Sequence, residues 1–572
     1  MDQTGVAHGL DQIAALLELQ GENPFRVRAF RSAARTVASL PGDLEAALGD
    51  GSLAATRGIG PAILQIVSEL AAGNRSRAYE ELRQQVPPGL IEMLAISGLG
   101  VAKVRRIHEH LGIDTLSDLE AAARDGRLAE VPGFGVRSCE NVLRGLAFLR
   151  RAGTALLLHH ALREAEELRT ALEKVPGVFR AHVAGDVRRR MEIVRELVFV
   201  LVAEVPPATV FDRLAEVPGV DEFAGQDERR ATLRFAGGAA AQVVVTPPMN
   251  LGAVMVQATG SRGHVTRLAA HAAARGHTLH GGALWRGSEF VPTPDERTLY
   301  ASLGLPDIPP ELREGRHELE LAASGLPQLV EVSDLRGFVH CHTDFSDGTC
   351  SIEELARACR EVGYDYVGLT DHSGSAAYAG GLRVDDLERQ WAEVDRVNRG
   401  VPGIRVLKGV EVDILPDGRL DYGDEVLGRF DFVIASLHDD CGQNEAELTE
   451  RVLRAMDDPH MAVMGHPTGR MLLSREPYPM DLGRIFARAG ERGVAMEINA
   501  DPHRLDLDWR VLDQAREAGV TISIGADAHS VAGLENMQHG VSMARKGGLE
   551  PKEILNTRPA EEFLAFAQAR RG

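Results

Sequence analysis

From residue 337 to the end, the sequence alternates between short apolar runs and longer amphipathic segments. The apolar runs are GFVHCH, YVGLTDH, VLKGVEVDI, FVIASLH, MAVMGHP, VAMEIN and TISIGADAH, with segments such as SIEELARACREVG and WRVLDQAREAG between them. Strands that alternate with helices form parallel β/α units, because a parallel strand pair needs a long crossover connection. The pattern therefore predicts seven parallel strands in a β/α barrel.

Each predicted strand ends in side chains of the kind that bind metal ions. These side chains are His340, His342, Asp371, His372, Glu411, Asp413, His438, His466, Glu497, Asn499, Asp527 and His529. On a strand, residues two apart point to the same face, so His340 and His342 are expected to face one cation while Cys341 points away. Asp347 follows in a turn. Any one of these residues could be a polar side chain at the edge of a core. Their recurrence at the carboxyl ends of all seven runs, where β/α barrels carry their chemistry, predicts a multinuclear metal site.

Length, charge and cysteine usage set broader limits. A chain of 572 residues is long enough for several domains, and no apolar run approaches the ~18 residues of a membrane span. The five cysteines form no CxxC pair, which predicts reduced thiols in a cytoplasmic, nucleoid-associated protein. The net charge of −20 argues against a nucleic-acid partner at first sight. However, residues 1–150 are nearly balanced, so one domain can bind a polyanion while another binds cations.

Residues 5–150 are expected to be helical and contain a repeated turn. The three copies are RGIGPAI (57–63), SGLGVAK (97–103) and PGFGVRS (132–138), each with Gly-apolar-Gly between helical segments. Glycines allow close approach of the backbone, and the following helix offers free N–H groups to a phosphate. A helix-capping turn would explain a single copy, but three copies favour helix-hairpin-helix binding to the DNA backbone. The predicted DNA contacts are Gly58, Gly60, Gly98, Gly100, Lys103, Arg105, Arg106, Gly133, Gly135 and Arg137.

Longer stretches resemble the bacterial family X DNA polymerases. They are ENPFRVRAFRSAARTVASLP (22–41), TGSRGH (259–264), LGLPDIPPELREGRHELELAA (303–323), EVDILPDGRLDY (411–422), GHPTGR (465–470) and EINADPHRLDL (497–507). The resemblance covers residues 5 to about 565. It implies an α-helical helix-hairpin-helix region, an α+β nucleotidyltransferase-like middle and a carboxyl-terminal distorted seven-stranded β/α barrel, the PHP (polymerase and histidinol phosphatase) domain, with three metals. The implied domains are 1–90 (helical, DNA-binding), 91–152 (helix-hairpin-helix, fingers-like), 153–248 (degenerate palm), 249–325 (thumb-like) and 326–572 (PHP). The implied metal ligands are His340, His342, Asp347, His372, Glu411, His438, His466, Asp527 and His529.

The middle segment departs from the family pattern. Nucleotidyl transfer needs two carboxylates two apart on one strand and a third on a neighbouring strand to hold a metal pair. In AGDVRRRMEIVRELVFVLV (184–202), the first two positions fall on Glu196 and Val198, and the third falls on Gln242 in AAAQVVVTPP (239–248). Asp186 stands where serine is usual. Because valine cannot bind a metal, the core is expected to keep its fold and DNA contacts without polymerising.

The intact ligand set of the barrel predicts where activity resides. Imidazole and carboxylate ligands suit Mn²⁺, Zn²⁺ or Fe²⁺ better than Mg²⁺. Asp371 is expected to orient a ligand or act as a base, and Arg470 and Arg504 are expected to contact substrate phosphate or to form structural ion pairs. The sequence thus predicts a metal-dependent 3′–5′ exonuclease or 3′-end-processing enzyme of DNA repair, acting on primer ends, gaps or damaged 3′ ends.

Three alternatives remain open at this level. They are an active repair polymerase with a PHP exonuclease, a non-catalytic scaffold that binds DNA ends, and a small-molecule phosphatase. Protein partners and oligomeric state are not predicted. Residues 1–100 contain no lysine, which argues against a deoxyribose-phosphate lyase in that region.

Overall fold

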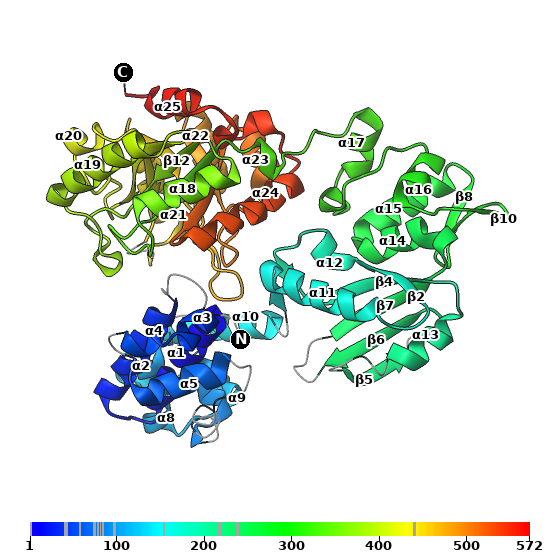
Figure 1. Ribbon diagram of the computed structural model, residues 1–572, viewed down its shortest axis with the longest axis horizontal. Coiled ribbons are helices and arrows are strands. Elements are labelled where there is room, and N and C mark those ends of the chain that lie inside the picture. The colour runs from blue at the N-terminus through cyan, green and yellow to red at the C-terminus, as the bar shows by residue number, and fades with distance from the viewer. Residues whose placement is uncertain are drawn as a thin grey trace. The chain divides into compact units, whose positions relative to one another are not determined.

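A computed structural model describes residues 3–571 apart from 39–43, 57–58, 72–75, 77–78, 80–81, 83–84, 95, 97–98, 153–154, 215–216, 218–219, 226, 236–239 and 439–441. The chain divides into two compact units (Figure 1). The first comprises Met1–Gly153 and Leu473–Arg475, and the second comprises Thr154–Leu472 and Glu476–Gly572. Among the described residues, no helix combines the length and apolar character needed to cross a membrane.

The first unit is helical, as predicted, and its described residues contain no strand. Its helices are α1 (Gln3–Leu19), α2 (Pro24–Ala38), α3 (Leu44–Gly49), α4 (Ser52–Ala55), α5 (Pro61–Ala71), α7 (Pro88–Met93), α8 (Val101–Leu111), α9 (Leu116–Asp125), η1 (Arg127–Glu130) and α10 (Val136–Ala152). Helix α1 buries Leu10, Ile13 and Leu17 at helical spacing against one core. A second core, around Val104 and Leu119, holds α8 and α9 together.

The second unit begins with a five-stranded sheet in the order β2-β4-β7-β6-β5. The elements of this region are β1 (Leu156–Leu157), α11 (Leu158–Leu172), β2 (Val178–Val183), α12 (Gly185–Arg188), β3 (Ile193–Val194), β4 (Leu197–Ala203), α13 (Pro207–Leu214), β5 (Val220–Gly225), β6 (Arg230–Phe235) and β7 (Ala240–Thr246). Strand β4 reads LVFVLVA and is almost entirely buried, as its continuous apolar run predicts. It pairs in parallel with β7, whereas the other pairs of this sheet are antiparallel.

A smaller region with its own core follows. Its elements are η2 (Pro248–Asn250), α14 (Leu251–Thr259), α15 (Arg262–Ala273), β8 (His277–His280), β9 (Ala283–Arg286), β10 (Glu289–Val291), α16 (Glu296–Ser302), η3 (Pro310–Leu312) and α17 (Glu318–Ser324). Strands β8, β9 and β10 form an antiparallel sheet. The fully buried side chains of Leu268, Leu284 and Tyr300 join the helices to this sheet.

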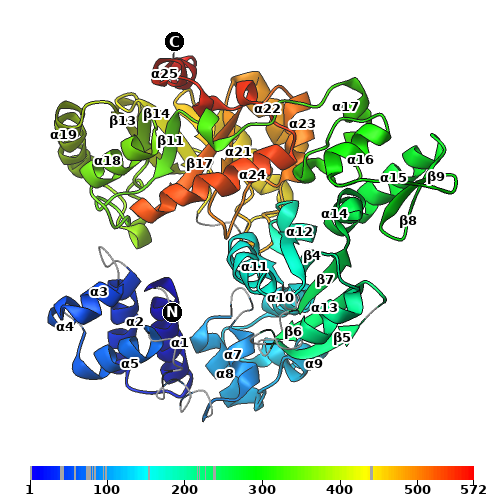
Figure 2. The ribbon, with the colours of Figure 1, turned by 45° about the vertical axis from the view of Figure 1, so that its right-hand side comes forward.

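The remainder forms the predicted barrel, closed by seven parallel strands from β11 round to β17. The strands are β11 (Gly337–Cys341), β12 (Tyr366–Leu369), β13 (Arg405–Asp413), β14 (Phe432–Ser436), β15 (Met461–Met464), β16 (Ala495–Asn499) and β17 (Ile522–Ala528). The helical segments are η4 (Val332–Asp334), α18 (Ile352–Val362), η5 (Ala377–Ala379), α19 (Val384–Gly400), α20 (Asp424–Leu427), α21 (Glu445–Met456), α22 (Leu482–Arg492), η6 (Trp509–Val511), α23 (Leu512–Glu517), η7 (Val531–Asn536), α24 (Met537–Lys546), η8 (Pro551–Glu553), η9 (Leu555–Thr557) and α25 (Ala560–Gln568). Figures 1 and 2 show helices such as α18, α19 and α21 lying outside the strands.

The last helix closes the amino-terminal end of the barrel. The ring of Phe563 in α25 lies 5.4 Å from the ring of Tyr366 and 5.3 Å from that of Phe432, centroid to centroid. Tyr366 and Phe432 are the first residues of β12 and β14, so aromatic packing fills this end. The opposite end, where the strands finish, remains for the polar side chains.

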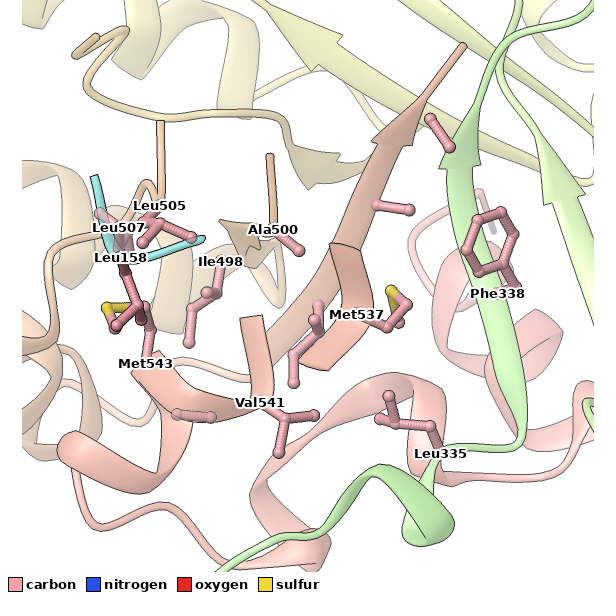
Figure 3. Close-up of a cluster of buried hydrophobic side chains, with 14 of the residues drawn as sticks. Leu158, Leu335, Phe338, Ile498, Ala500, Leu505, Leu507, Met537, Val541 and Met543 are labelled. Atoms are coloured by element: carbon pink, nitrogen blue, oxygen red, sulfur yellow. The ribbon is translucent and has the colours of Figure 1, made fainter. Parts of the chain in front are cut away.

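The barrel and the sheet region share a core. One cluster of buried side chains includes Leu158 of α11 together with Ile498, Leu507 and Met543 of the barrel region (Figure 3). Polar contacts reinforce this packing: the buried Lys546 Nζ of α24 donates to the Arg189 carbonyl at 2.9 Å. These contacts fix the sheet region against the barrel.

Candidate metal centre

The nine predicted ligands lie together at the carboxyl ends of the barrel strands. They form four overlapping groups, and within each group the ligand atoms lie within 4.8 Å of one another. The groups are His342–Asp347–His372–His529, His340–His466–Asp527, His340–His342–Glu411 and His372–Glu411–His438. Among the described residues, no other part of the chain contains such a group. Strands far apart in sequence thus supply one centre.

Glu411 lies in the middle of this cluster. It is 1% exposed, and its two carboxylate oxygens approach imidazole nitrogens from both sides. The distances are 3.4 Å to His340 Nε2, 3.7 Å to His342 Nε2, 3.1 Å to His372 Nδ1, 3.4 Å to His438 Nε2 and 2.9 Å to His466 Nε2. A carboxylate with one oxygen toward each side could supply ligand atoms to both sides of the cluster.

Several atoms of the cluster are buried without a hydrogen-bond partner among the described residues. They are His340 Nε2, both ring nitrogens of His342, His372 Nδ1, His466 Nδ1 and Glu411 Oε2. Buried polar atoms are nearly always hydrogen-bonded, so this concentration of buried nitrogen and oxygen atoms without a partner indicates that a bound ligand completes the site. Divalent cations with a preference for imidazole and carboxylate fit these residues.

One of the four groups has an unusual backbone. His340, His466 and Asp527 have φ values of 60°, 24° and 48°, in the left-handed region that non-glycine residues rarely adopt. Such conformations cost free energy and cluster at functional sites. His340 and His342 nevertheless lie in one group with Glu411, as expected. Strand β11 shifts register between Val339 and Cys341 and ends at Cys341, so His342 follows the strand rather than continuing it.

Cys341 lies outside these groups, in the hydrophobic core. It is fully buried, and its Sγ donates to the Gly368 carbonyl at 3.3 Å. Burial raises the pKa of the Cys341 thiol well above its ordinary value.

Two acids at strand ends orient the histidines and stand apart from the four groups. Glu497 Oε1 lies 2.5 Å from His340 Nδ1, and Asp413 Oδ1 lies 2.5 Å from His438 Nδ1. Each carboxylate fixes the ring so that Nε2 points into the cluster, as carboxylates commonly do for metal-binding histidines. Both acids end strand-like runs in the sequence, but only the distances separate an orienting role from ligation.

Asp371 holds a loop rather than a histidine. Its buried carboxylate accepts hydrogen bonds from Thr343 N, Thr343 Oγ1 and Gln390 Nε2, each at 2.7 Å, and from Ser346 Oγ at 2.5 Å. The loop that it braces carries Asp347. With both oxygens already accepting twice, Asp371 is better suited to positioning Asp347 than to accepting a proton from substrate.

The two predicted arginines differ in their freedom to contact substrate. Arg470 is 5% exposed, and its guanidinium donates to Asp508 Oδ2 at 2.6 Å and to the carbonyls of Arg504 and Leu505. These contacts favour a structural role for Arg470. Arg504 lies closer to the centre, with Nε 3.5 Å from Asp527 Oδ2.

The carboxylates control the charge of the imidazoles. Against the effect of burial, Glu411 and its neighbours raise the pKa of His438 to about 10. In the same way, Asp347 helps to raise the pKa of His529 to about 9 despite burial. Burial dominates at His372 and lowers its pKa to about 4. A cation at this centre would displace protons from His438 and His529.

The cluster opens to solvent on one side. The imidazoles of His372 and His529 both stack on that of His342, with ring centroids 4.4 Å apart in each pair. The side chains of His529 and Asp347 are 41% and 32% exposed, whereas His342 is fully buried. A phosphate ester can therefore approach the group that contains these residues.

The residues expected at the polymerase positions lie side by side in the sheet region. Val198 of β4 pairs with Gln242 of the parallel strand β7, and Glu196 precedes β4 and accepts a hydrogen bond from Gln242. Burial raises the pKa of Glu196. Two of these three neighbouring positions thus carry side chains without a carboxylate.

The arginines beside this position are engaged within the chain. Arg188 makes two hydrogen bonds to the Glu296 carboxylate, with the first at 2.7 Å, and Arg189 pairs with Asp186 at 2.5 Å and Glu314 at 3.2 Å. Carboxylates of the chain itself therefore occupy positions around these guanidinium groups.

The described turns of the first unit leave their glycines open. A Cβ built at Gly60, Gly100 or Gly135 would meet no atom within 4 Å, and none of the three has a positive φ. Neither a positive φ nor internal packing thus requires glycine at these positions. Each of the three directly precedes a helix, where glycine also serves as an N-cap, and the open space beside it leaves room for an external group. Gly58 and Gly98 lie outside the described residues, as does the side chain of Arg137.

The neighbouring predicted contacts are arranged differently. Arg106 donates to the Pro132 carbonyl at 2.7 Å, which braces the next turn, where Gly133 has a φ of 86°. Arg105 forms an exposed ion pair with Glu109 at 2.7 Å, and Lys103 Nζ lies 5.9 Å from the centre of the Phe134 ring. Arg105 is exposed, whereas Lys103 is half-buried.

Comparison with known families agrees with this architecture. The Helix-hairpin-helix domain family matches residues 1–76, and the SAM-like Helix-hairpin-helix tandem family matches residues 90–147. The DNA polymerase beta thumb family matches residues 254–314, and the PHP domain family matches residues 339–501. The fold and the site thus define a polymerase-type, DNA-binding protein with a metal-binding PHP barrel.

Individual relatives identify the family. The chain is 34% identical over 570 residues, 99% of both chains, to the "DNA polymerase/3'-5' exonuclease PolX" of Bacillus subtilis. Over 243 residues, 40% of this chain and 94% of the relative, it is 29% identical to a "Probable phosphatase" of Syntrophotalea carbinolica. A "Probable phosphatase" of Caldanaerobacter subterraneus is 31% identical over 171 residues, 28% of this chain and 60% of the relative. The chain belongs to the bacterial family X DNA polymerases that carry a PHP domain.

Proposed function

We propose that this protein is a metal-dependent 3′–5′ exonuclease of DNA repair whose activity resides in the barrel and whose polymerase-like core no longer polymerises. The observation that carries the proposal is the contrast between two sites in one chain. Nine potential ligands converge in the barrel, whereas Val198 and Gln242 face each other across β4 and β7. The name of the Bacillus subtilis relative, which includes both activities, supports the exonuclease half.

The residues of the barrel would act in distinct ways. The nine clustered side chains would hold divalent cations, and Glu497 and Asp413 would keep the imidazoles of His340 and His438 turned inward. Bound cations would supply positive charge to the scissile phosphate and lower the pKa of a water. Arg504 would add charge at the inner edge, and Asp347 and His529 would border the approach path of the phosphodiester.

The polymerase-like core would serve DNA binding. Of the three expected positions, only Glu196 carries a carboxylate, and nearby Asp186 is paired with Arg189. One free carboxylate cannot hold a pair of metal ions, and Arg188 is likewise neutralised by Glu296. The open turns at Gly60, Gly100 and Gly135 would contact the DNA backbone without reading sequence. Primer ends, gaps and damaged 3′ ends are the proposed substrates.

A small-molecule phosphatase is the second candidate. The resemblance to proteins named "Probable phosphatase" covers the barrel and favours this reading for the isolated site. The presence of DNA-binding family matches over residues 1–147 favours DNA instead.

Product analysis tests the proposal. Full-length protein with Mn²⁺ is expected to release a labelled nucleoside monophosphate from a strand labelled in its 3′-terminal nucleotide. His342→Ala and the more exposed His529→Ala should both abolish release while leaving the unfolding midpoint of the protein within a few degrees. Release of inorganic phosphate alone, from a 3′-phosphorylated strand, would support the phosphatase. No release from any substrate would support a scaffold.

A further inference from the structure

Tyr378 stands at the mouth of the metal centre. It lies in η5, on the loop between β12 and α19, and is 65% exposed. Its ring centroid is 6.1 Å from that of His372 and 6.2 Å from that of His438, with interplanar angles of 59° and 68°. All other described aromatic residues of the barrel are buried or half-buried. The exposed ring thus sits beside two of the clustered imidazoles.

The loop that carries Tyr378 is anchored on both sides. Ala376 and Ala379 are 0% and 3% exposed, so the residues around the tyrosine pack into the protein. Ser375 N donates to Asp421 Oδ2 at 2.9 Å, and Leu382 N donates to the His372 carbonyl at 2.8 Å. The backbone on both sides of Tyr378 is therefore held in place, and its ring is largely exposed beside the two imidazoles. A single exposed apolar residue is ordinary, but one on an anchored loop beside a catalytic cluster is not.

The chemistry around the mouth divides into a polar and an apolar part. His529, Asp347 and Arg504 supply charged or polar groups on the side of the cluster that suits a phosphodiester. Tyr378 supplies a flat apolar surface beside His372, which links the two sides by belonging to both the His529 group and the His438 group. A nucleotide has the same two parts, a phosphate and a planar base.

We propose that Tyr378 stacks on the base of the 3′-terminal nucleotide and so positions its phosphodiester at the metal centre. This inference rests on the proposed exonuclease function and names the part of the substrate that the site would recognise. Because every base has a π-face, the contact would favour unpaired 3′ ends without selecting a sequence. It would also distinguish DNA from phosphate esters that have no base.

The test compares two single strands that differ only at the 3′ end, one with a terminal thymidine and the other with a terminal abasic residue. Base–aromatic stacking corresponds to roughly 5- to 150-fold in kcat/KM for removal of the terminal nucleotide. Wild-type protein with Mn²⁺ should prefer the thymidine end by a factor in this range. Tyr378→Phe keeps the ring and should keep the preference. Tyr378→Ala and Tyr378→Leu should remove it, and their rate on the abasic end should match that of the wild type.

The outcomes separate the inference from the proposed function. If wild-type protein removes both ends equally fast, or if Tyr378→Ala keeps the wild-type preference, the stacking role is wrong and the exonuclease remains. An equal loss on both ends in Tyr378→Ala would assign the residue to loop structure instead. If wild-type protein shortens neither strand but hydrolyses small phosphate esters, both proposals fail.

Discussion

Glu497→Gln should strongly weaken metal binding at the centre, although glutamine has nearly the size of glutamate. The Glu497 carboxylate is fully buried and accepts from His340 Nδ1 at 2.5 Å, from His466 N at 2.6 Å and from Asn499 Nδ2 at 3.1 Å. A glutamine amide has one acceptor oxygen, so its NH₂ group must face either His340 or the backbone N–H of His466. If the NH₂ group faces His340, Nδ1 of the imidazole must accept a hydrogen bond from it. The imidazole proton then lies on Nε2, the atom that faces Glu411 and Asp527. That tautomer cannot bind a cation through Nε2.

Asp413→Asn is the matched control, because it removes the same charge without forcing the proton shift. Asp413 accepts from His438 Nδ1 at 2.5 Å through one oxygen and from Ser375 Oγ at 2.7 Å through the other. A serine hydroxyl can accept as well as donate, so the asparagine can turn its NH₂ toward Ser375 and keep its oxygen on His438. The imidazole then retains the tautomer that points its free nitrogen inward.

The expected magnitudes follow from this difference. Loss of an orienting partner typically weakens metal binding by about 10- to 100-fold, or roughly 1.4 to 2.7 kcal/mol. We expect Glu497→Gln in the upper part of this range or beyond, and Asp413→Asn below about tenfold.

Titration with Mn²⁺ under calorimetric detection measures both affinities at constant pH. The order of the two variants is the result that matters, because both lose one negative charge. Equal losses, or a larger loss in Asp413→Asn, would refute the tautomer argument and leave charge alone as the cause.

Three further predictions concern pH and the turns proposed to bind DNA. His539 is 7% exposed, and burial lowers its pKa to about 4, with a further lowering by Arg190 and an opposing effect of Asp501. Below pH 6.5 the unfolded chain therefore binds a proton at this histidine that the folded chain does not bind. The free energy of unfolding consequently falls as the pH drops. His539→Gln should reduce the loss of unfolding free energy between pH 7 and 5 by about 2 kcal/mol, measured by urea unfolding, and an unchanged pH dependence would contradict this assignment. The pKa values of His438 and His529 are raised to about 10 and about 9, so Mn²⁺ binding should release protons, and the affinity for Mn²⁺ should increase from pH 7 to 9. Calorimetry in buffers of different ionisation enthalpy measures this proton release. Heats of binding that are the same in all buffers would contradict the prediction. Gly100→Val should weaken DNA binding about tenfold, the value of one hydrogen bond to a charged group. Because Gly100 is the N-cap of α8, this change should cost the first unit no more than about 1 kcal/mol. Gly89→Ala should destabilise the first unit more strongly, because its Cβ would lie 2.1 Å from the Asp114 carbonyl oxygen.

The barrel was predictable because its signals are local. Each strand is a short apolar run, and each carries its polar residues at the end that the β/α rule assigns to the site. Helix α18 runs from Ile352 to Val362, within the expected segment SIEELARACREVG, and a Ser351–Glu354 capping box marks its start. In WRVLDQAREAG the first turn is a 3₁₀ helix, with α23 starting at Leu512, a difference that an apolar pattern does not reveal.

The roles of individual site residues could not be predicted from the sequence, because they depend on distances between residues that are far apart in the chain. Glu497 and Glu411 both end apolar runs, yet one approaches the outer nitrogen of a single histidine and the other lies among five imidazoles. Arg470 and Arg504 are both plausible phosphate contacts in sequence, and only the chain around Arg470 shows that its guanidinium is already engaged. The left-handed backbone at His340 contradicts the local preference for an extended strand, and tertiary packing overrides that preference.

The position of Tyr378 beside the metal centre could not be predicted from the sequence either. Nothing in the sequence around AAYAGG marks a tyrosine beside a metal site, because its position follows from a loop that returns to β12 through Ser373 and Leu382. The value of the residue becomes visible only when exposure and the distance to His372 are known together.

The most direct test of an active barrel beside an inactive polymerase-like core is the length of a 5′-labelled primer on its template, with Mn²⁺ and all four deoxynucleotides present. We expect wild-type protein to shorten the primer, His342→Ala to leave it unchanged, and neither protein to extend it. Extension by His342→Ala would contradict the central claim, because it would show that Glu196, Val198 and Gln242 do not mark a lost polymerase site.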